Sequence, residues 1–231
     1  MAAITPEALR QFPLLRYASD ETLARLVAVA EKTEFAYGDI VWHAAEEPLK
    51  VGLLRRGIIE IVRVTATGAE VTLALFGPRE CPGLFAVLDG KKFPADARVL
   101  SEVAEIVWLP RDPLLEAIDR DPGLARAMSE VLRHHTGVLR EKVDVLTAGE
   151  VPQRLAMLFL VLLDRFGDEG PGGELQLPVV LSRRALARLV NARVETVIRV
   201  LSKWDKESFV ETSDQGFVVR DTDRLHVEAG R

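Results

Sequence analysis

The chain has 231 residues and a formal net charge of −5; 48% of its residues are hydrophobic and 28% are charged. These proportions exclude wholesale disorder, and the length suits two modest domains. The most apolar run, 155–163, is too short to cross a bilayer, and the start lacks the apolar stretch of a secretory signal, so we expect a cytoplasmic protein. The single cysteine, Cys81, excludes an intramolecular disulfide and a four-cysteine metal cluster.

The first hundred residues change from a helical to a strand-like pattern. Thr5 and Pro6 are typical of a helix start, and a second helix is expected over 20–32. Between Gly38 and Trp108, spaced glycines separate short β-branched runs, as in consecutive antiparallel strands. Because polar and apolar residues alternate imperfectly, we expect both faces of some strands to be covered. The pattern favours a barrel or jelly roll over an open sheet.

The pattern becomes helical again after Pro110. A short helix is predicted from Pro113, and a long one from Pro122 to about Thr147. The long helix has a first apolar row with heptad spacing, formed by Leu124, Ala127, Val131, Val138 and Val145 and completed by His134 and Glu141. A second row consists of Met128, Leu132, Leu139, Val143 and Leu146. We expect the first row to pair with a second copy in a homodimer. The alternative is packing against the chain's own barrel, and the second row indicates that the helix does both.

A break and a further helix follow. Gly149 is expected to end the long helix, and Glu150 with Pro152 predicts the start of the next one, which ends at Gly167. Gly149 and Glu150 are therefore the predicted hinge.

A helix-turn-helix is predicted next. Ser182 is expected to cap a short helix, and a second helix begins after Asn191 and Ala192. The predicted buried positions are Ala185, Leu186, Leu189, Val197, Val200, Leu201 and Trp204. The outward face of the second helix shows Val194, Glu195, Ile198, Arg199 and Ser202. These side chains offer the methyl groups, acceptor and bidentate donor that contact base edges in the major groove. Two strands joined by a turn at 214–216 are expected to form a wing.

The charge of this region agrees with a nucleic-acid partner. Residues 181–206 hold seven basic and two acidic residues in an acidic protein. Such a local excess indicates a polyanion partner, the alternative being a solvated helix face.

The segment LSRRALARLVNARVETVIRVLSKW resembles the DNA-binding segment of the cyclic-AMP receptor protein and fumarate-nitrate regulator superfamily, the CRP/FNR family. GDIVW, LRRGIIEIVR, SEVAEIVWL and VPQRLAMLFLVL are similar to other parts of that family, so the resemblance covers about 35–225. It implies an α+β fold with an N-terminal cyclic-nucleotide-binding-like β-roll (a double-stranded β-helix or jelly roll), a long dimerisation helix and a C-terminal winged helix-turn-helix. The implied domains are 1–109 for the N-terminal helices and the sensor β-roll, 110–148 for the dimerisation helix and 149–231 for DNA binding.

The resemblance implies a homodimeric transcription regulator on a palindromic operator in double-stranded DNA, with RNA polymerase as a further partner and no membrane. Glu195 and Arg199 match the family's two main base-reading positions, and Ile198 departs from the serine common there. The DNA-binding residues expected are Ser182, Arg183, Arg193, Val194, Glu195, Thr196, Ile198, Arg199 and Lys203.

The effector pocket departs from the family pattern. Cyclic-nucleotide-binding members carry a glutamate for the ribose and, about ten residues later, an arginine for the cyclic phosphate. Leu84 stands at the glutamate position and Phe93 about where the arginine would lie, so cyclic AMP is not the expected effector. The candidate pocket residues are Cys81, Gly83, Leu84, Lys91, Lys92, Leu139 and Arg140. Lys91 and Lys92 offer positive charge to an anion, or simply form a solvated turn.

Haem is the effector to test first. Cys81 precedes Pro82, a pairing seen in haem-regulated proteins, and lies near the turn where certain gas-sensing relatives carry a haem-ligating cysteine. His134 or His135 is the candidate for the second axial ligand. The alternatives are a redox-active thiol, an unidentified ligand and constitutive activity; a lone cysteine is also a common small buried hydrophobe.

Motifs of other chemistry are missing from the sequence. The glycines at 83 and 90 flank six residues, but no Ser or Thr follows Lys91, so a phosphate loop is not indicated. No G-x-S-x-G or H-E-x-x-H motif occurs. We therefore expect neither an enzyme nor a metal site. The alternative of a different class is a cupin-like barrel, a small-molecule-binding protein or enzyme with an appended nucleic-acid-binding module, for which the β-roll offers only His43 as a metal ligand.

Overall fold

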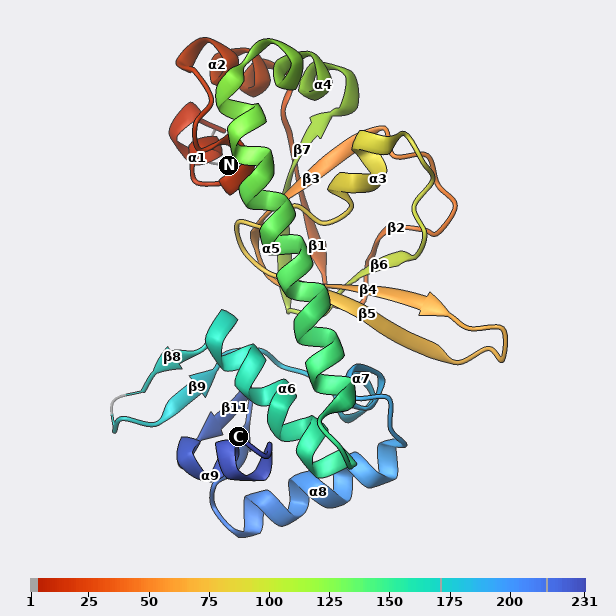
Figure 1. Ribbon diagram of the computed structural model, residues 1–231, viewed down its shortest axis with the longest axis vertical. Coiled ribbons are helices and arrows are strands. Elements are labelled where there is room, and N and C mark those ends of the chain that lie inside the picture. Colours follow the sequence, from red (N-terminus) through yellow and green to blue (C-terminus); the bar gives the residue numbers. More distant parts are fainter. Residues whose placement is uncertain (1–3, 171, 215) are drawn as a thin grey trace. The chain divides into compact units, whose positions relative to one another are not determined.

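The computed structural model describes residues 4–170, 172–214 and 216–231, and the chain divides into two compact units (Figure 1). The first comprises Met1–Arg63 and Leu75–Val138, and the second comprises Val64–Ala74 and Leu139–Arg231. Within the described residues, no helix is both long and apolar enough to cross a membrane.

The first unit opens with three short helices, α1 (Pro6–Arg10), the 3-10 helix η1 (Pro13–Leu15) and α2 (Asp20–Val29). The predicted cap is present, since the Thr5 hydroxyl accepts a hydrogen bond from the Ala8 N–H. The second helix ends at Val29 and not at residue 32 as expected. Lys32 lies instead in the strand β1 (Glu31–Ala36), where its ammonium bonds the Glu105 carboxylate of the neighbouring strand at 3.1 Å. Strand pairing has thus overridden the local helical pattern.

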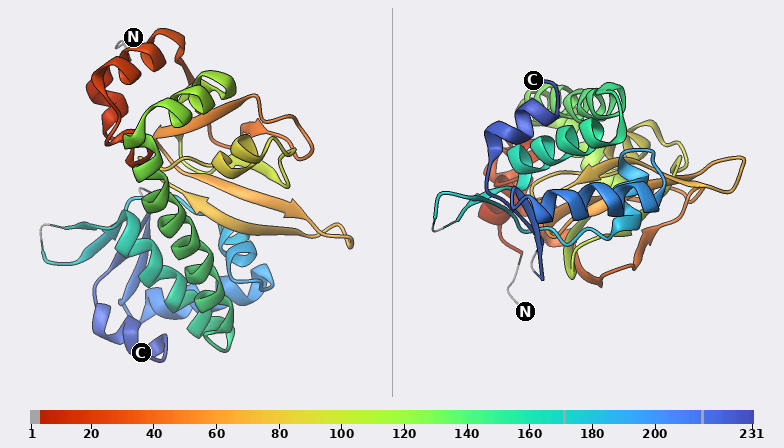
Figure 2. Two further views of the ribbon diagram at one scale, coloured as in Figure 1. Left: turned by 45° about the horizontal axis from the view of Figure 1, so that its top comes forward. Right: turned by 90° about the horizontal axis from the view of Figure 1, so that it is seen from below.

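The strands confirm the predicted β-roll. After β1 they are β2 (Ile40–Trp42), β3 (Lys50–Arg56), β4 (Ile59–Val64), β5 (Glu70–Phe76), β6 (Asp96–Val99) and β7 (Val103–Pro110). They form one sheet in the order β1-β7-β3 and another in the order β2-β6-β4-β5. Figure 2 gives two further views of the ribbon. The β3–β4 turn needs glycine at Gly57, where φ is +91° and a Cβ would lie 2.4 Å from the Val103 carbonyl oxygen.

The core of the first unit lies between the N-terminal helices, β3, β7 and the two helices α3 (Leu84–Asp89) and α4 (Arg111–Arg120). Its fully buried members include Leu9, Leu14, Leu23, Leu53, Leu84, Leu109, Leu114 and Leu124. α4 begins two residues before the expected start, at Arg111. Pro113 is accommodated because the N–H groups of a helix's first turn have no intrahelical acceptor.

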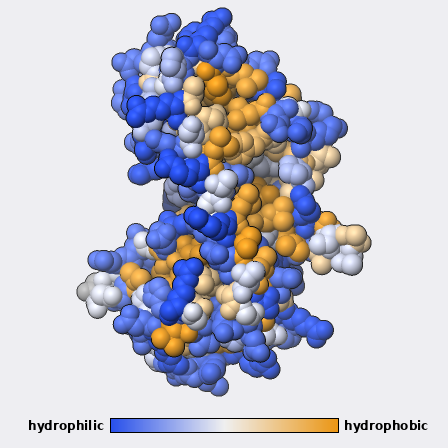
Figure 3. Space-filling view, in the orientation of Figure 1, coloured by the Kyte–Doolittle hydropathy of each residue, from blue (hydrophilic) through white to orange (hydrophobic). Residues whose placement is uncertain are grey.

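The long helix α5 (Pro122–Thr147) has the predicted bounds, but its two apolar rows are used differently from the expectation. In the first row, Leu124, Ala127, Val138 and Val145 are buried within this chain. In the second row, Leu132, Leu139, Val143 and Leu146 are 38–57% exposed. The row expected to face a second copy therefore packs internally, and the second row is the exposed one. Figure 3 shows that hydrophobic residues lie among hydrophilic ones on the face in view.

The second unit contains the predicted helix-turn-helix and wing. Its further elements are α6 (Val151–Phe166), β8 (Asp168–Glu169), β9 (Leu175–Leu177), α7 (Arg183–Leu189), α8 (Val194–Lys206), β10 (Val210–Ser213), β11 (Gly216–Val219) and α9 (Thr222–Glu228). The sheet order is β10-β11-β9-β8. Aromatic contacts join α6, α8 and the sheet: the Phe159 ring lies 6.0 Å from Trp204 and 5.0 Å from Phe217. The wing is confirmed, although Gln215, in the turn predicted at 214–216, lies outside the described residues.

The break between α5 and α6 has the predicted chemistry. Gly149 has φ +114°, and Glu150 forms a reciprocal capping box with Gln153, whose side-chain oxygen accepts from the Glu150 N–H at 2.7 Å. α6 ends before Gly167, as expected.

Candidate nucleic-acid interface

Two short helices and a tight connection build the interface. The Ser182 hydroxyl accepts from the Ala185 N–H at 3.1 Å and begins α7. Residues 189–193, the elbow, run from the last residue of α7 to the start of α8, with Asn191 in the left-handed region at φ +49°. All seven positions predicted to be buried are less than 9% exposed: Ala185, Leu186, Leu189, Val197, Val200, Leu201 and Trp204. α8 is thus held on its apolar face, and its opposite face is free.

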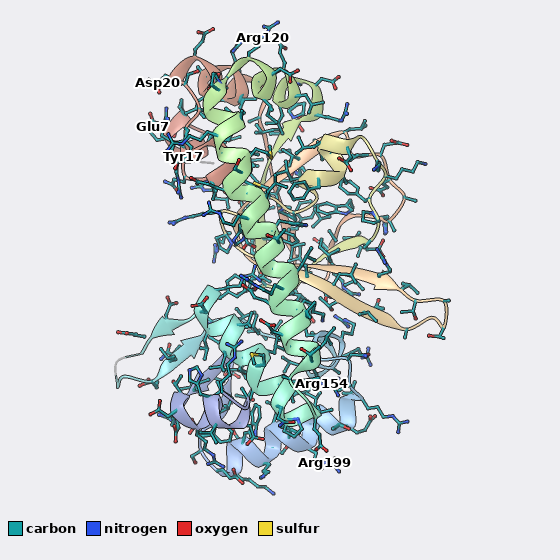
Figure 4. All side chains as sticks on the ribbon, viewed as in Figure 1. Glu7, Tyr17, Asp20, Arg120, Arg154 and Arg199 are labelled. Carbon is teal, nitrogen blue, oxygen red and sulfur yellow. The ribbon has the colours of Figure 1, made fainter. Side chains whose placement is uncertain are left out.

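The exposed face of α8 presents the predicted base-reading side chains. Glu195 and Arg199 are exposed, and Ile198 is 46% exposed, whereas Val194 is half-buried. Among the described residues, neither Glu195 nor Arg199 has an ion-pair or hydrogen-bonding partner for its side chain. A carboxylate and a guanidinium one helical turn apart thus present an acceptor and a bidentate donor together. Figure 4 shows Arg199 on α8 at the lower edge of the second unit.

The remaining predicted residues take different places. The Arg183 guanidinium donates to the Thr212 hydroxyl at 2.7 Å and lies over the Phe217 ring, so it links α7 to the wing. Thr196 is half-buried, and Arg193 and Lys203 are exposed. Five of the predicted residues are thus exposed on α8 or directly before it: Arg193, Glu195, Ile198, Arg199 and Lys203. The side chains of Ser182 and Arg183 instead form hydrogen bonds within the second unit.

Lys206 was not among the DNA-binding residues predicted from the sequence. A recess of about 360 Å³ is lined by Arg199, Ser202, Lys203, Lys206 and Glu207. Lys206 is exposed in the last turn of α8. The basic excess of 181–206 includes this lysine, so the signal that could have found it was present.

Comparisons with known proteins agree with this geometry. Residues 32–121 match the family model of the cyclic nucleotide-binding domain, and residues 153–227 match that of the Crp-like helix-turn-helix domain. Together the two matches cover more than half of the chain. The chain belongs to the CRP/FNR family of DNA-binding transcription regulators.

Individual CRP/FNR relatives extend the similarity over nearly the whole chain. A CRP-like cAMP-activated global transcriptional regulator of Mycobacterium tuberculosis is 25% identical over 95% of this chain and 97% of its own length. The cyclic AMP receptor protein of Thermus thermophilus is 27% identical over 90% of this chain and 93% of its own. In fold, the chain is similar to FixK2 from Bradyrhizobium japonicum, with a TM-score of 0.74 and 20% identity over 86% of this chain and 96% of that one.

The CRP/FNR sensor domain raises the question of a cyclic nucleotide, and the residues present do not fit one. Leu84 is 1% exposed in the apolar core, and the Phe93 ring stacks on Trp42 at 4.5 Å. Gly83 lies against the same two rings. Arg98, on β6, forms an ion pair with the buried Glu60 carboxylate at 2.8 Å. The positions that would contact ribose and phosphate are thus apolar.

Apart from Cys81, the other predicted pocket residues are exposed. Lys91 pairs with Asp89 at 3.3 Å and Lys92 with Glu47 at 3.5 Å, all largely exposed. Leu139 and Arg140 are exposed on α5. The solvated-turn interpretation of the two lysines is therefore the one that the contacts favour.

The residues around Cys81 show whether a haem would fit there. A cavity of about 210 Å³ is lined by Pro13, Leu14, Pro78, Arg79, Glu80, Cys81, Val131 and His134. This volume is below the roughly 300–1,000 Å³ of drug-sized ligand sites. Burial, with the charge of Glu80 added, raises the pKa of the Cys81 thiol to about 12.

The two histidines also have other partners. His134 Nε2 lies 2.6 Å from the Glu80 carboxylate, and the His135 ring packs on Phe85 at 4.5 Å. Burial lowers the pKa of His135, with the neighbouring charge of His134 acting in the same direction. These residues do not fit a haem.

Proposed function

We propose that this regulator is a homodimer that binds a two-fold symmetric operator. In this proposal residues 1–109 form the sensor, 110–148 the dimerisation helix and 149–231 the DNA-binding domain, with RNA polymerase as the protein partner that the family resemblance suggests. The cell compartment that suits these partners is the cytoplasm. The proposed DNA contacts are Arg193, Val194, Glu195, Ile198, Arg199, Lys203 and Lys206.

The observation that carries the proposal is the exposed apolar row of α5. Leu132, Leu139, Val143 and Leu146 follow one another at steps of seven, four and three residues. Heptad-spaced leucine and valine exposed to water on a long helix are typical of a coiled-coil seam with a second copy. A dimer of this kind presents two copies of α8, and therefore favours half-sites about one helical turn apart.

The side chains of α8 favour a TGA-like core in each half-site. Arg199 is the proposed bidentate donor to guanine, Glu195 accepts from the cytosine amino group of the complementary strand, and Val194 favours a thymine methyl. Ile198 offers no hydrogen bond, so the outermost base of the half-site is proposed to be read weakly.

Selection of binding sites from random duplex DNA tests this proposal. We expect a palindrome with a TGA-like core, and light scattering of the purified protein is expected to give twice the mass of 25.6 kDa. Selected sequences without a palindrome, or a monomeric protein on a single half-site, would overturn it.

We further propose that the sensor responds to something other than cyclic AMP. The apolar Leu84 and Phe93 support this, because a cyclic phosphate buried beside them lacks its charge partner. Titration calorimetry with millimolar cyclic AMP is expected to give no saturable heat. Saturable binding in the micromolar range would contradict the proposal.

A further inference from the structure

Two basic side chains meet the elbow of the helix-turn-helix from two different helices. Lys142, on α5, donates from its ammonium to the Leu189 carbonyl oxygen at 2.5 Å. Arg154, on α6, donates from one guanidinium nitrogen to the Val190 carbonyl oxygen at 2.8 Å and to that of Asn191 at 3.2 Å. Three consecutive carbonyls at the end of α7 are thus bonded by positive side chains (Figure 4 labels Arg154).

The end of a helix is where such donors are most effective. The last carbonyls of a helix have no intrahelical donor and form the negative end of its dipole. Val190 is fully buried and Asn191 is in the left-handed region, so these carbonyls lie in a tightly constrained turn. Lys142 and Arg154, here called the elbow clamp, supply charged donors to this turn.

The burial of Lys142 argues against an incidental contact. Burial lowers the pKa of its ammonium to about 8, and among the described residues no carboxylate pairs with it. A lysine half-buried without a counter-ion costs stability unless hydrogen bonds compensate. The Leu189 carbonyl is the acceptor that the structure gives it.

The clamp also spans the break at Gly149. Lys142 precedes the break on α5, and Arg154 follows it on α6. Both therefore fix the same elbow from either side of the predicted hinge, and the elbow leads directly into α8.

We propose that Lys142 and Arg154 are positioning residues that hold the helix-turn-helix elbow against α5 and α6 and thereby set how α8 is presented to DNA. The inference rests on the DNA-reading role proposed for α8. Neither residue needs to contact DNA, because both act through the elbow backbone.

Lys142→Met tests the clamp, since methionine keeps an unbranched apolar side chain close to the length of the lysine stem and removes the donor. Hydrogen exchange of the DNA-free protein is expected to become faster at residues 189–193. Affinity for the palindromic duplex obtained by selection is expected to fall about fivefold, the equivalent of one hydrogen bond, with an unchanged salt dependence. Lys142→Arg, which keeps a charged donor, is expected to restore both readouts to within about twofold of wild type.

Lys203→Met is the matched control, because a lysine that contacts phosphate contributes to the salt dependence of binding. We expect it to lower the salt slope and leave exchange at the elbow unchanged. If Lys142→Met fails to fold, Arg154→Lys provides the same exchange test, because it removes the guanidinium that donates to the Val190 and Asn191 carbonyls.

Unchanged exchange at 189–193 in Lys142→Met, or no rescue by arginine, would overturn the clamp. A reduced salt slope in Lys142→Met would also overturn it, by indicating a direct phosphate contact. The exchange experiment contains no DNA, so its outcome is distinguishable from a failure of the proposed operator binding.

Discussion

At the scale of single residues, Arg199 is the side chain to which we assign the proposed guanine contact. Its guanidinium is exposed and has no protein partner within the described residues, so it is available for the bidentate contact that guanine offers. Arg199→Ala is expected to cost on the order of 1–3 kcal/mol per half-site and to relax the preference for guanine. Competition binding with duplexes substituted at that base measures both effects.

Lys203→Ala is the comparison for this prediction. Loss of a phosphate contact weakens binding to every sequence alike and reduces the salt slope by about one. If Arg199→Ala lowered affinity equally for all substituted duplexes, Arg199 would be a phosphate contact and not a reader of guanine.

Asp121 gives a prediction for the stability of the first unit at low pH. Burial raises the pKa of its carboxyl, but hydrogen bonds outweigh that effect and lower the pKa to about 2. Two of them come from the N–H groups of Ser19 and Gly123, each at 2.8 Å. Because the folded-state pKa is depressed, the stabilisation is complete above the unfolded-state pKa near 4 and is lost as pH falls through about 2.

Asp121→Asn removes the charge, so we expect the variant to be less stable at pH 7 by roughly 1.5–3 kcal/mol. The difference from wild type is expected to shrink steadily between about pH 4 and pH 2. Urea denaturation across this range measures it, and a difference that does not depend on pH would contradict the assignment.

At the scale of elements, Gly149 is the position where sequence and structure agree on a break. A side chain there is strained by φ +114°, and its Cβ would lie 2.4 Å from the Gln153 side-chain oxygen that caps α6. Gly149→Ala is therefore expected to lower the free energy of unfolding by about 1–3 kcal/mol. Gln153→Ala, which removes the cap without backbone strain, is expected to cost about 1 kcal/mol. Chemical denaturation of the two variants compares them, and a Gly149→Ala variant as stable as wild type would argue against a conformational role.

The elements also show which parts of the fold the sequence predicts. The bounds of α5 and α6 follow from apolar periodicity and caps, because those signals are local. The same signals predict seven buried positions in α7 and α8, although Ala187 is buried as well. The two rows of α5 have similar spacing, so periodicity does not indicate which row packs internally. The first row buries Leu124, Ala127, Val138 and Val145, whereas the second row leaves three leucines exposed.

The candidate interface, too, could be predicted only in part from the sequence. The face of α8 follows from a period of 3.6 residues, but Lys142 has no signal of its own, since a lysine on a long helix reads as solvated. Its position against the Leu189 carbonyl arises from the packing of helices distant in sequence. Leu84 and Phe93 were identified as departures from a ligand-binding pattern, and their burial gives the physical reason: they complete the core.

At the scale of the whole molecule, the proposed dimer depends on the exposed row of α5. A lysine in the middle of this row places a charge in an apolar seam, where its desolvation opposes association. Leu139→Lys with Val143→Lys is therefore expected to convert the dimer to a monomer without unfolding the chain, because both side chains are already 48–57% exposed. Sedimentation measures the mass, and circular dichroism checks the fold.

The DNA affinity of that variant distinguishes a dimer seam from an ordinary exposed face. Two linked copies of α8 bind a palindrome far more tightly than one, because the second contact is intramolecular. The double variant is expected to lose at least a hundredfold in affinity for the full palindrome, on the order of what linkage supplies, while binding an isolated half-site as wild type does. Val227→Lys is the control, since Val227 is 75% exposed on α9 and outside the row; it is expected to leave mass and affinity unchanged. If the double variant still sedimented as a dimer, the two-fold symmetry of the regulator would have to come from another surface, and the half-site spacing inferred from α5 would no longer follow.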